Sequence, residues 1–392
     1  MFMIPYGRHS ISDEDIEAVV RVLRSDFLTQ GPRIPEFELQ IAKKVNANFA
    51  VAVNSATSAL HLACLALGVK RGDVVWTSPI TFVASANCAR YCGAQVDFID
   101  IDTRTYNLSI IKLEEKLELA KKEGRLPKVV IPVHLAGQSC EMSEIKELSK
   151  KYHFRIIEDA SHAVGGMYKG EPIGNCKYSD ISVFSFHPVK IITTGEGGVA
   201  VTNDAELNHR MARLRSHGIT RSQEEMTIPS EGDWFYQQLE LGYNYRMTDL
   251  QAALGISQLQ RLDEFVSKRH DLASNYDKLL KGKPVISPFQ HKDSYSAFHL
   301  YIVRLKLEEI NVTHRQVFER LRSHGIQVNL HYIPVYRHPY YAKMGYKRQD
   351  FPEAEAYYSE AISLPLYPDL TFDQQELVVE RLLTPLGHQT IF

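Results

Sequence analysis

The sequence predicts an α/β protein in which a mostly parallel seven-stranded sheet domain is followed by a smaller C-terminal α+β domain. Seven short apolar runs lie between Phe49 and Thr202, and segments with a helical spacing of apolar residues separate the earlier runs. Strands that alternate with helices in this way form parallel sheets that are covered by helices on both faces. After Asn203 the pattern changes, which indicates a second, differently built unit.

The predicted strands are FAVAV (49–53), VVWTS (74–78), QVDFID (95–100), KVVIPV (128–133), FRIIED (154–159), ISVFSF (181–186) and GGVAVT (197–202). Helices are predicted within TSALHLACLALG, LEEKLELAKK and MSEIKELSKK, because their apolar residues recur every three or four positions. Only a short loop separates the last two strands, so we expect one antiparallel member of the sheet.

Helices are expected to dominate residues 203–280, including one long helix that starts at Thr248. KGKPVISP (281–288) then indicates a boundary. It is followed by a strand in LYIVRL, a helix in THRQVFERLRSHG, a short strand in IQVNL (326–330) and two more helical stretches. We therefore divide the chain into residues 1–247, an N-terminal segment with the large domain, and residues 248–392, the linking long helix with the small domain.

The composition excludes several classes of partner. Lys and Arg total 45 and Asp and Glu total 47, so the chain lacks the basic excess that is typical of nucleic-acid binding. No apolar run approaches the roughly 20 residues of a membrane helix, and the N-terminus does not resemble a secretion signal. We expect a cytoplasmic protein without nucleic-acid or membrane partners. Its five cysteines suit neither a disulfide framework nor a zinc site, so we predict no metal and buried, reduced thiols.

Polar residues follow five of the predicted strands, in Asn54–Ser58, Ser78–Phe82, His134–Gln138, Asp159–His162 and Ser185–Lys190. In open α/β sheets ligands bind at the carboxyl ends of the strands. We therefore expect these five segments to meet around one crevice.

The segment NSATSALHL (54–62) is a candidate phosphate site. A helix that starts near Ala56 leaves its first N–H groups unpaired, and together with the helix dipole they favour an anion. Simple N-capping by Ser55 or Thr57 explains the same residues, so both interpretations stay open. The chain has no GxxxxGK[ST] motif, and GEGG does not follow the dinucleotide pattern, so ATP and NAD sites are not expected.

Asp159 and Lys190 are the candidate chemical groups. Asp159 ends an apolar strand, where a carboxylate either caps the next segment or faces a basic ring nitrogen and favours its protonated form. Lys190 lies in SFHPVKIITTGEGG and is either a snorkelling lysine or a desolvated nucleophile with a lowered pKa. An anion site, an aspartate and such a lysine together suit pyridoxal 5′-phosphate. Phe82 either stacks on its ring or belongs to the core.

The motifs NSATSAL, PITFVASAN, HLAGQ, EDASHAVG, SFHPVKIITTGEGG and GYNYRMTDLQAALG occur in the order found in the DegT/DnrJ/EryC family of sugar aminotransferases. The chain resembles that family over nearly its whole length. This resemblance implies the aspartate-aminotransferase-like fold (fold type I), with the cofactor in the large domain. FLTQGP, SFHPVKIITT and HYIPVY are similar to the branch of the family that acts in pseudaminic acid biosynthesis.

The resemblance also implies a role for each matching residue. Lys190 would form the Schiff base with the cofactor and shuttle the proton, and Asp159 would pair with the pyridinium nitrogen. His162 would contact the ring and Phe82 would stack on it. The phosphate would be held by Ala56, Thr57, Ser185 and Asn244 of the partner subunit. The nucleotide sugar would contact Tyr6, Asp26, Phe27, Leu28, Thr29, Ala56, Ser185, Asn244, His331, Tyr332, Ile333 and Pro334, and Arg246 is a further candidate for an anionic substrate group.

The implied activity is transfer of an amino group from glutamate, leaving 2-oxoglutarate, to the C4 keto group of a UDP-linked 4-keto-6-deoxy-N-acetylhexosamine. The implied assembly is a homodimer with shared active sites. Three alternatives stay open. They are an aminotransferase for another nucleotide-linked keto sugar, such as a 3-keto or dTDP sugar, a deoxysugar dehydratase with histidine in place of the lysine, and a non-catalytic cofactor-binding regulator. Lys190 argues against the dehydratase, although His187 lies close to it in the sequence.

Overall fold

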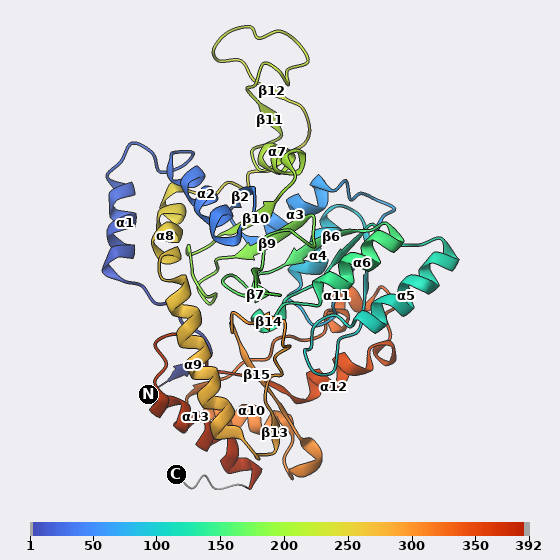
Figure 1. Cartoon of the computed structure of the whole chain (residues 1–392), viewed down its shortest axis with the longest axis vertical. Coiled ribbons are helices and arrows are strands. Elements are labelled where there is room, and N and C mark those ends of the chain that lie inside the picture. Colours follow the sequence, from blue (N-terminus) through green and yellow to red (C-terminus); the bar gives the residue numbers. More distant parts are fainter. Residues whose placement is uncertain (1–2, 388–392) are drawn as a thin grey trace.

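The central sheet has seven strands in the order β2 (Phe49–Val53), β10 (Gly198–Thr202), β9 (Ile181–Ser185), β6 (Arg155–Asp159), β5 (Val129–Ile131), β3 (Val74–Thr77) and β4 (Gln95–Phe98). The computed structural model describes residues 3–387 (Figure 1). β10 runs antiparallel to both of its neighbours, and the other neighbouring strands are parallel. The predicted sheet and its antiparallel member are therefore confirmed.

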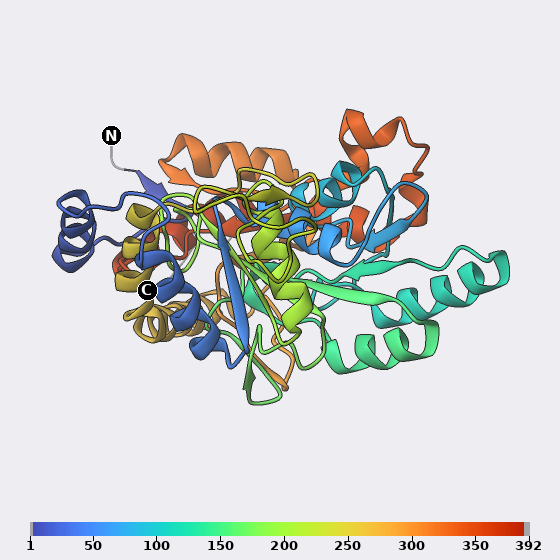
Figure 2. The same ribbon diagram turned by 90° about the horizontal axis from the view of Figure 1, so that it is seen from above.

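Helices cover both faces of this sheet because successive strand residues point to opposite sides. Val129 and Ile131 pack in one hydrophobic cluster, while Val130 packs in another. The first cluster includes α3 (Ala56–Ala66), α4 (Ala84–Tyr91) and α7 (Ala205–Leu214). The second includes α2 (Arg33–Val45), α5 (Ile110–Glu123), α6 (Met142–Tyr152) and α8 (Asp249–Leu259). α5 and α6 lie side by side (Figure 2).

The small domain is built on an antiparallel sheet of β13 (Val285–Ile286), β15 (Tyr301–Leu305) and β17 (Ala361–Leu364). α9 (Leu262–Leu280), α10 (His314–Ser323) and α13 (Phe372–Leu383) pack with it around a third hydrophobic cluster. Outside these units the chain also forms α1 (Asp13–Leu23), β7 (Met167–Tyr168), β8 (Glu171–Pro172), β14 (Ser294–Tyr295), α11 (Pro339–Ala342) and α12 (Pro352–Glu360). The predicted α+β character of the C-terminal part of the chain, with its antiparallel sheet and packed helices, is confirmed.

The prediction of one long helix from Thr248 is wrong, because this segment forms two helices, α8 and α9. Arg261 leaves the helical region with φ −101° and ψ 4°. Its guanidinium donates to the Ser10 carbonyl and pairs with Asp15, so the side chain is held by the N-terminal segment. The sequence QLQRLDEF contains no glycine or proline to signal this break. α9 then descends from the large domain into the small one (Figure 1).

The expected dominance of helices between residues 203 and 280 fails for the stretch after α7. β11 (Ile219–Thr220) and β12 (Gln237–Gln238) form an antiparallel pair there, and the loop between them projects from the rest of the molecule (Figure 1). Pro229 and Gly232 in this loop disfavour a helix. We call residues 219–241 the arm.

Two further differences concern strands of the C-terminal part. IQVNL gives only β16 (Ile326–Gln327), which pairs in parallel with β1 (Ile4–Pro5) near the N-terminus. β17 follows α12 directly, without a turn signal, and the sequence did not predict it. The domain boundary at residue 247 stays a prediction.

Candidate active site

A cavity of about 840 Å³ opens at the carboxyl ends of the parallel strands. Its walls include residues from the segments that follow β2, β3, β5, β6 and β9, together with residues 329–333 and 338. Four of the five expected strand-end segments meet here, which confirms that part of the prediction. The segment His134–Gln138 does not line the cavity, where only the preceding Val133 contributes. The polar groups that line it come from several elements that are far apart in the sequence, so the fold brings them together.

The N-terminus of α3 forms one end of the cavity. Ser55 caps the helix by accepting the Ser58 N–H at 3.2 Å, which leaves the N–H groups of Ala56 and Thr57 without helical acceptors. Ala56 and Thr57 both line the cavity. The capping and anion-binding interpretations are therefore compatible, because different residues serve each one.

β10 approaches this helix start so closely that a side chain does not fit. A Cβ on Gly198 would lie 2.5 Å from the Ala56 nitrogen and 2.6 Å from the Ser55 carbonyl carbon. Gly198 pairs with Val53 on one side and with Ser185 on the other. This glycine thus lets strand β10 support the first turn of α3 and bring it next to Ser185.

Asp159 stands at the end of β6 and is 5% exposed. Its Oδ2 accepts a hydrogen bond from the Ser85 hydroxyl at 2.5 Å, and its Oδ1 accepts the Ser161 N–H at 3.1 Å. Hydrogen bonds to a carboxylate favour its ionised form. Asp159 therefore offers a fixed negative charge to a cationic group in the cavity.

Lys190 lies in the loop between β9 and β10. Its side chain lines the cavity, while Ile191 and Ile192 beside it are buried. Burial lowers the pKa of the Lys190 ammonium to about 8, and the Asp159 carboxylate opposes this effect. An amine with this pKa is partly unprotonated near neutral pH, and the unprotonated form attacks a carbonyl carbon.

Three buried imidazoles surround this amine. Burial, assisted by the Lys190 charge, holds the pKa of His162 well below its usual value and lowers the pKa of His331 to about 3. Burial also lowers the pKa of His299, whose ring centroid lies 4.4 Å from that of His162. These histidines are therefore neutral and do not compete with a cationic ligand for the Asp159 charge.

The structure brings most of the predicted site residues to this cavity. Those that line it are Tyr6, Ala56, Thr57, Phe82, Asp159, His162, Ser185, Lys190, His331, Tyr332 and Ile333. Those that do not line it within one chain are Asp26, Phe27, Leu28, Thr29, Asn244, Arg246 and Pro334. Asn244 is exposed, and Thr29 pairs with Thr248 in an isolated bridge.

Sequence reasoning missed the residues that support Asp159 and the ring of His162. Ser85 was not singled out, although it lies three residues after Phe82 in the same PITFVASAN motif. Its contact with Asp159 spans 74 positions in the chain, and only the packing of α4 against the sheet creates it. His299 was missed for the same reason, since it comes from the segment before β15.

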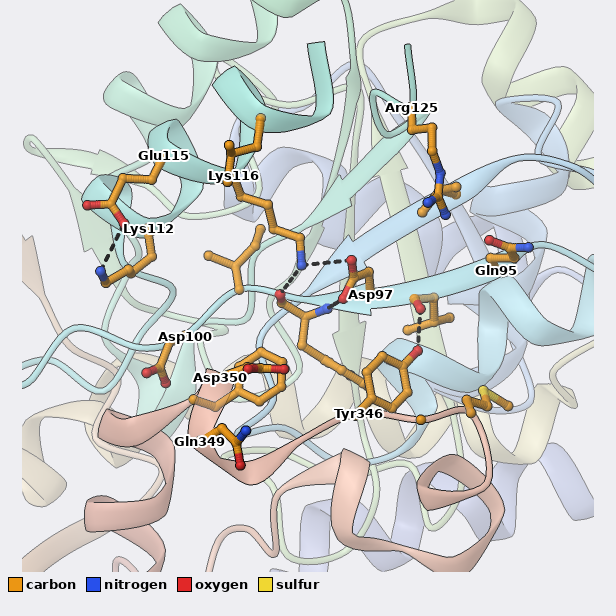
Figure 3. Close-up of a pocket in the computed structure, with 18 of the residues that line it drawn as sticks. Gln95, Asp97, Asp100, Lys112, Glu115, Lys116, Arg125, Tyr346, Gln349 and Asp350 are labelled. Carbon is orange, nitrogen blue, oxygen red and sulfur yellow. Dashed lines mark hydrogen bonds and ion pairs between the residues drawn. The ribbon is translucent and has the colours of Figure 1, made fainter. Parts of the chain in front are cut away.

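A second cavity, of about 980 Å³, lies at the outer edge of β4 and contains none of the predicted site residues (Figure 3). Four of the eight charged residues that line it form ion pairs with each other, Lys112 with Glu115 at 2.9 Å and Lys116 with Asp97 at 2.8 Å. Lys116 and Tyr346 also donate to the outward-facing carbonyls of Phe98 and Val96. These bonds protect the sheet edge, so this cavity is not the candidate active site.

Neither a metal site nor a membrane helix emerges from the structure. Within residues 3–387 no group of three or more His, Cys, Asp or Glu side chains could hold a metal ion. In the same part of the chain no helix is long and apolar enough to cross a membrane. Cys64, Cys88, Cys140 and Cys176 are buried free thiols, as expected, whereas Cys92 is half-buried.

The residues present fit pyridoxal phosphate. The unpaired N–H groups of α3 suit a phosphate, the ionised Asp159 suits a protonated ring nitrogen, and the amine of Lys190 suits an aldehyde. Gly198 keeps the backbone at the phosphate end free of a side chain. All of these groups belong to one chain and are already in place in this structure.

Comparison with known proteins identifies the family. The chain matches the DegT/DnrJ/EryC1/StrS aminotransferase family over residues 9–383. It is 40% identical to the spore coat polysaccharide biosynthesis protein SpsC of Bacillus subtilis, covering 96% of this chain and 95% of the relative. It is 39% identical to the UDP-4-amino-4,6-dideoxy-N-acetyl-beta-L-altrosamine transaminase of Campylobacter jejuni, covering 98% of both chains. It is 33% identical to the UDP-4-amino-4-deoxy-L-arabinose–oxoglutarate aminotransferase of Shewanella sediminis, covering 98% of this chain and 99% of the relative.

Solved structures agree. Helicobacter pylori PseC, an aminotransferase involved in the biosynthesis of pseudaminic acid, superimposes with a TM-score of 0.89 at 30% identity, covering 98% of this chain and 99% of PseC. The putative sugar aminotransferase Spr1654 of Streptococcus pneumoniae, solved in PLP and PMP forms, superimposes with a TM-score of 0.87 at 29% identity and with the same coverage. The fold type I expectation is confirmed, and the cofactor is pyridoxal phosphate. The chain is therefore a sugar aminotransferase that belongs to the DegT/DnrJ/EryC1/StrS family.

Proposed function

We propose that this enzyme transfers the amino group of glutamate to the C4 keto group of a UDP-linked 4-keto-6-deoxy-N-acetylhexosamine, a step suited to pseudaminic acid biosynthesis. The observation that carries the chemistry is Lys190, a half-buried lysine whose amine has a lowered pKa and which lines the same cavity as the Asp159 carboxylate. The choice of sugar is supported by the Campylobacter jejuni relative and by PseC. The choice of donor is supported by the oxoglutarate in the name of the Shewanella sediminis relative.

Each residue of the cavity has a distinct task in this proposal. Pyridoxal phosphate, when bound, supplies an aldehyde that takes up the amino group and a ring that accepts the electrons of a broken carbon–hydrogen bond. Asp159 keeps a proton on the ring nitrogen through its charge. Nζ of Lys190 accepts the proton from the α-carbon of glutamate, and in the second half of the reaction it delivers a proton to C4 of the sugar.

The remaining contacts are assigned by position. Ala56, Thr57 and Ser185 hold the phosphate, and Phe82, which is 57% exposed in the single chain, lies against the ring. Tyr6 and the segment 331–333 line the side of the cavity where the sugar would enter.

A second copy of the chain completes this site. Asn244 and residues 26–29 lie outside their own cavity, so in this proposal Asn244 of the partner subunit reaches the phosphate. The arm and its base expose large apolar side chains, with Trp234 at 72%, Tyr236 at 51% and Leu241 at 78% exposure. Exposed apolar groups gathered on one projecting segment are typical of a protein–protein contact, here with the second copy.

Product analysis tests the choice of sugar. The purified enzyme is incubated with glutamate and, in separate reactions, with UDP-4-keto-6-deoxy-N-acetylhexosamines of both C5 configurations, a dTDP-4-keto sugar and a 3-keto sugar. We expect the highest kcat/KM with one of the UDP-linked 4-keto sugars and an amino group at C4 of the product by NMR. A preference for the dTDP or 3-keto sugar would contradict the proposed substrate and leave the aminotransferase chemistry intact.

A further inference from the structure

We propose that Ser85 is a positioning residue for Asp159. Through a relay of hydroxyl groups that begins at Thr81, it keeps the carboxylate ionised and oriented toward the ring nitrogen of the cofactor. This inference rests on the proposed role of Asp159.

The relay is short and buried. Thr81 Oγ1 lies 2.7 Å from Ser85 Oγ, and Ser85 Oγ lies 2.5 Å from Asp159 Oδ2. Thr81 is 2% exposed, Ser85 is 0% exposed and Asp159 is 5% exposed. Water therefore has little access to these bonds, and the protein must supply the donors that the carboxylate needs.

The direction of each hydrogen bond follows from what each group can donate. An ionised carboxylate only accepts, so the single hydrogen of the Ser85 hydroxyl points to Asp159. Ser85 Oγ must then accept the hydrogen of Thr81. The Phe82 carbonyl, at 3.4 Å, is a more distant acceptor for Ser85 than Asp159 is.

Two elements hold the carboxylate from different sides. Ser85 comes from α4, whereas the Ser161 N–H that binds Oδ1 comes from the turn after β6. Each carboxylate oxygen therefore has one fixed donor and retains a free lone pair for the cofactor. Hydrogen-bond donors to a buried carboxylate favour its ionised form, and a protonated carboxyl group would not keep the ring nitrogen charged.

Ser85 is not used to cap its own helix. Serine near a helix start commonly serves the backbone, but α4 has Val83 at its N-cap position without a side-chain cap bond. The hydroxyl is turned across to β6 instead. Phe82 precedes α4 and Ser85 lies in its first turn, so these two residues, three positions apart, reach the cavity and the carboxylate, respectively.

The test compares Ser85→Ala, Ser85→Thr and Ser78→Ala in the full-length protein. Ser78 is the matched control, because it is 1% exposed at the end of β3 and its hydroxyl accepts from the Ile80 N–H instead of contacting Asp159. Three quantities are measured: the Kd of pyridoxal phosphate for the apoenzyme, the pH dependence of that Kd, and kcat and KM separately.

For Ser85→Ala we expect cofactor binding about tenfold weaker, since a hydrogen bond to a charged group is lost. We also expect the weakening of cofactor binding at acidic pH to begin at a higher pH in this variant. Its kcat should fall by a larger factor than the KM of the sugar rises. Ser85→Thr keeps the hydroxyl and should behave like the wild type, as should Ser78→Ala. A Ser85→Ala enzyme with unchanged Kd and pH profile, or one altered only in thermal stability, would overturn the inference.

Asp159→Ala separates this inference from the proposed function. If Asp159→Ala loses cofactor affinity while Ser85→Ala does not, only the role of Ser85 is wrong. If Asp159→Ala binds the cofactor as the wild type does, the assignment of Asp159 itself fails. Should Ser85→Ala not fold, Thr81→Val tests the relay one bond further from the carboxylate, and an unchanged Kd and pH profile there would overturn it.

Discussion

The hydroxyl of Tyr332 lies 3.0 Å from Nε2 of His162 and connects the segment after β16 to the turn after β6 across the cavity. Nδ1 of His162 accepts the Ala136 N–H at 3.3 Å, so Nε2 of this neutral ring carries the hydrogen and donates it to Tyr332. Burial raises the pKa of Tyr332, so the phenol keeps its own hydrogen. That hydrogen is free to bind a ligand in the cavity.

Tyr332→Phe should therefore lower kcat/KM without unfolding the protein. The loss of one donor to substrate or cofactor corresponds to about a tenfold effect. Tyr341→Phe is the control, because Tyr341 is buried outside this cavity and bonds Asn87 at 2.6 Å. Steady-state kinetics in which both variants match the wild type would contradict the role assigned to Tyr332.

The lowered pKa of Lys190 predicts its reactivity toward a small electrophile. In the apoenzyme, labelling of Lys190 by fluorodinitrobenzene should rise with pH through a midpoint near 8. Lys177, whose pKa is raised by its hydrogen bond to Glu171, should react only at much higher pH. Peptide mass spectrometry measures both sites in one sample, and identical profiles would contradict the prediction.

The same experiment reports on the charge of Asp159. That carboxylate stabilises the Lys190 ammonium, so it raises the pKa of the amine against the effect of burial. Asp159→Asn removes the charge and should shift the labelling midpoint of Lys190 to lower pH. A shift to higher pH would show that the two groups are not coupled in this way.

Gly198→Ala tests the close approach of β10 to the start of α3. The new Cβ would meet backbone atoms, which cannot move aside as a side chain does, so we expect a loss of about 1–3 kcal/mol in the free energy of unfolding. Cofactor affinity should fall as well, because the first turn of α3 shifts. Gly7→Ala is the control, since its nearest neighbours lie 3.8 and 3.9 Å away. Equal effects on denaturant unfolding in both variants would contradict the steric argument.

A shared site predicts complementation between two inactive variants. In a hybrid dimer of Lys190→Ala and Asn244→Ala chains, one site combines an intact Lys190 with an intact Asn244 of the partner subunit. Random mixing of the two chains should therefore restore about a quarter of wild-type activity if the assembly is a two-fold dimer. If Asn244 acted within its own chain, no hybrid would contain an intact site, and the mixture would stay inactive. Sizing of each protein confirms that dimers are compared.

The large domain could be predicted from the sequence because its signals are local. Each strand of the sheet is an apolar run. Asp159 and Ser185 end two of these strands, and Lys190 follows five residues after Ser185. The rule that ligands bind at the carboxyl ends of parallel strands then places these residues together without any distance being known. The start of α3 could likewise be named as a candidate phosphate site from the sequence alone, because the N-terminus of a helix favours an anion.

The remaining features depend on contacts between distant parts of the chain. The break between α8 and α9 is fixed by Arg261 reaching Asp15, 246 positions away, and β17 is defined by its pairing with β15. The support of Asp159 by Ser85 likewise exists only after α4 has packed on the sheet. A single sequence contains no local pattern for such contacts, so the structure was needed to find them.

The most direct test of the account is to identify the lysine that binds the cofactor covalently. Borohydride reduction of the holoenzyme, followed by peptide mapping, should place a pyridoxyl group on Lys190, and Lys190→Ala should retain the fold but carry no label. A pyridoxyl group on any other lysine, or a Lys190→Ala enzyme that still converts the keto sugar, would contradict the central role of Lys190.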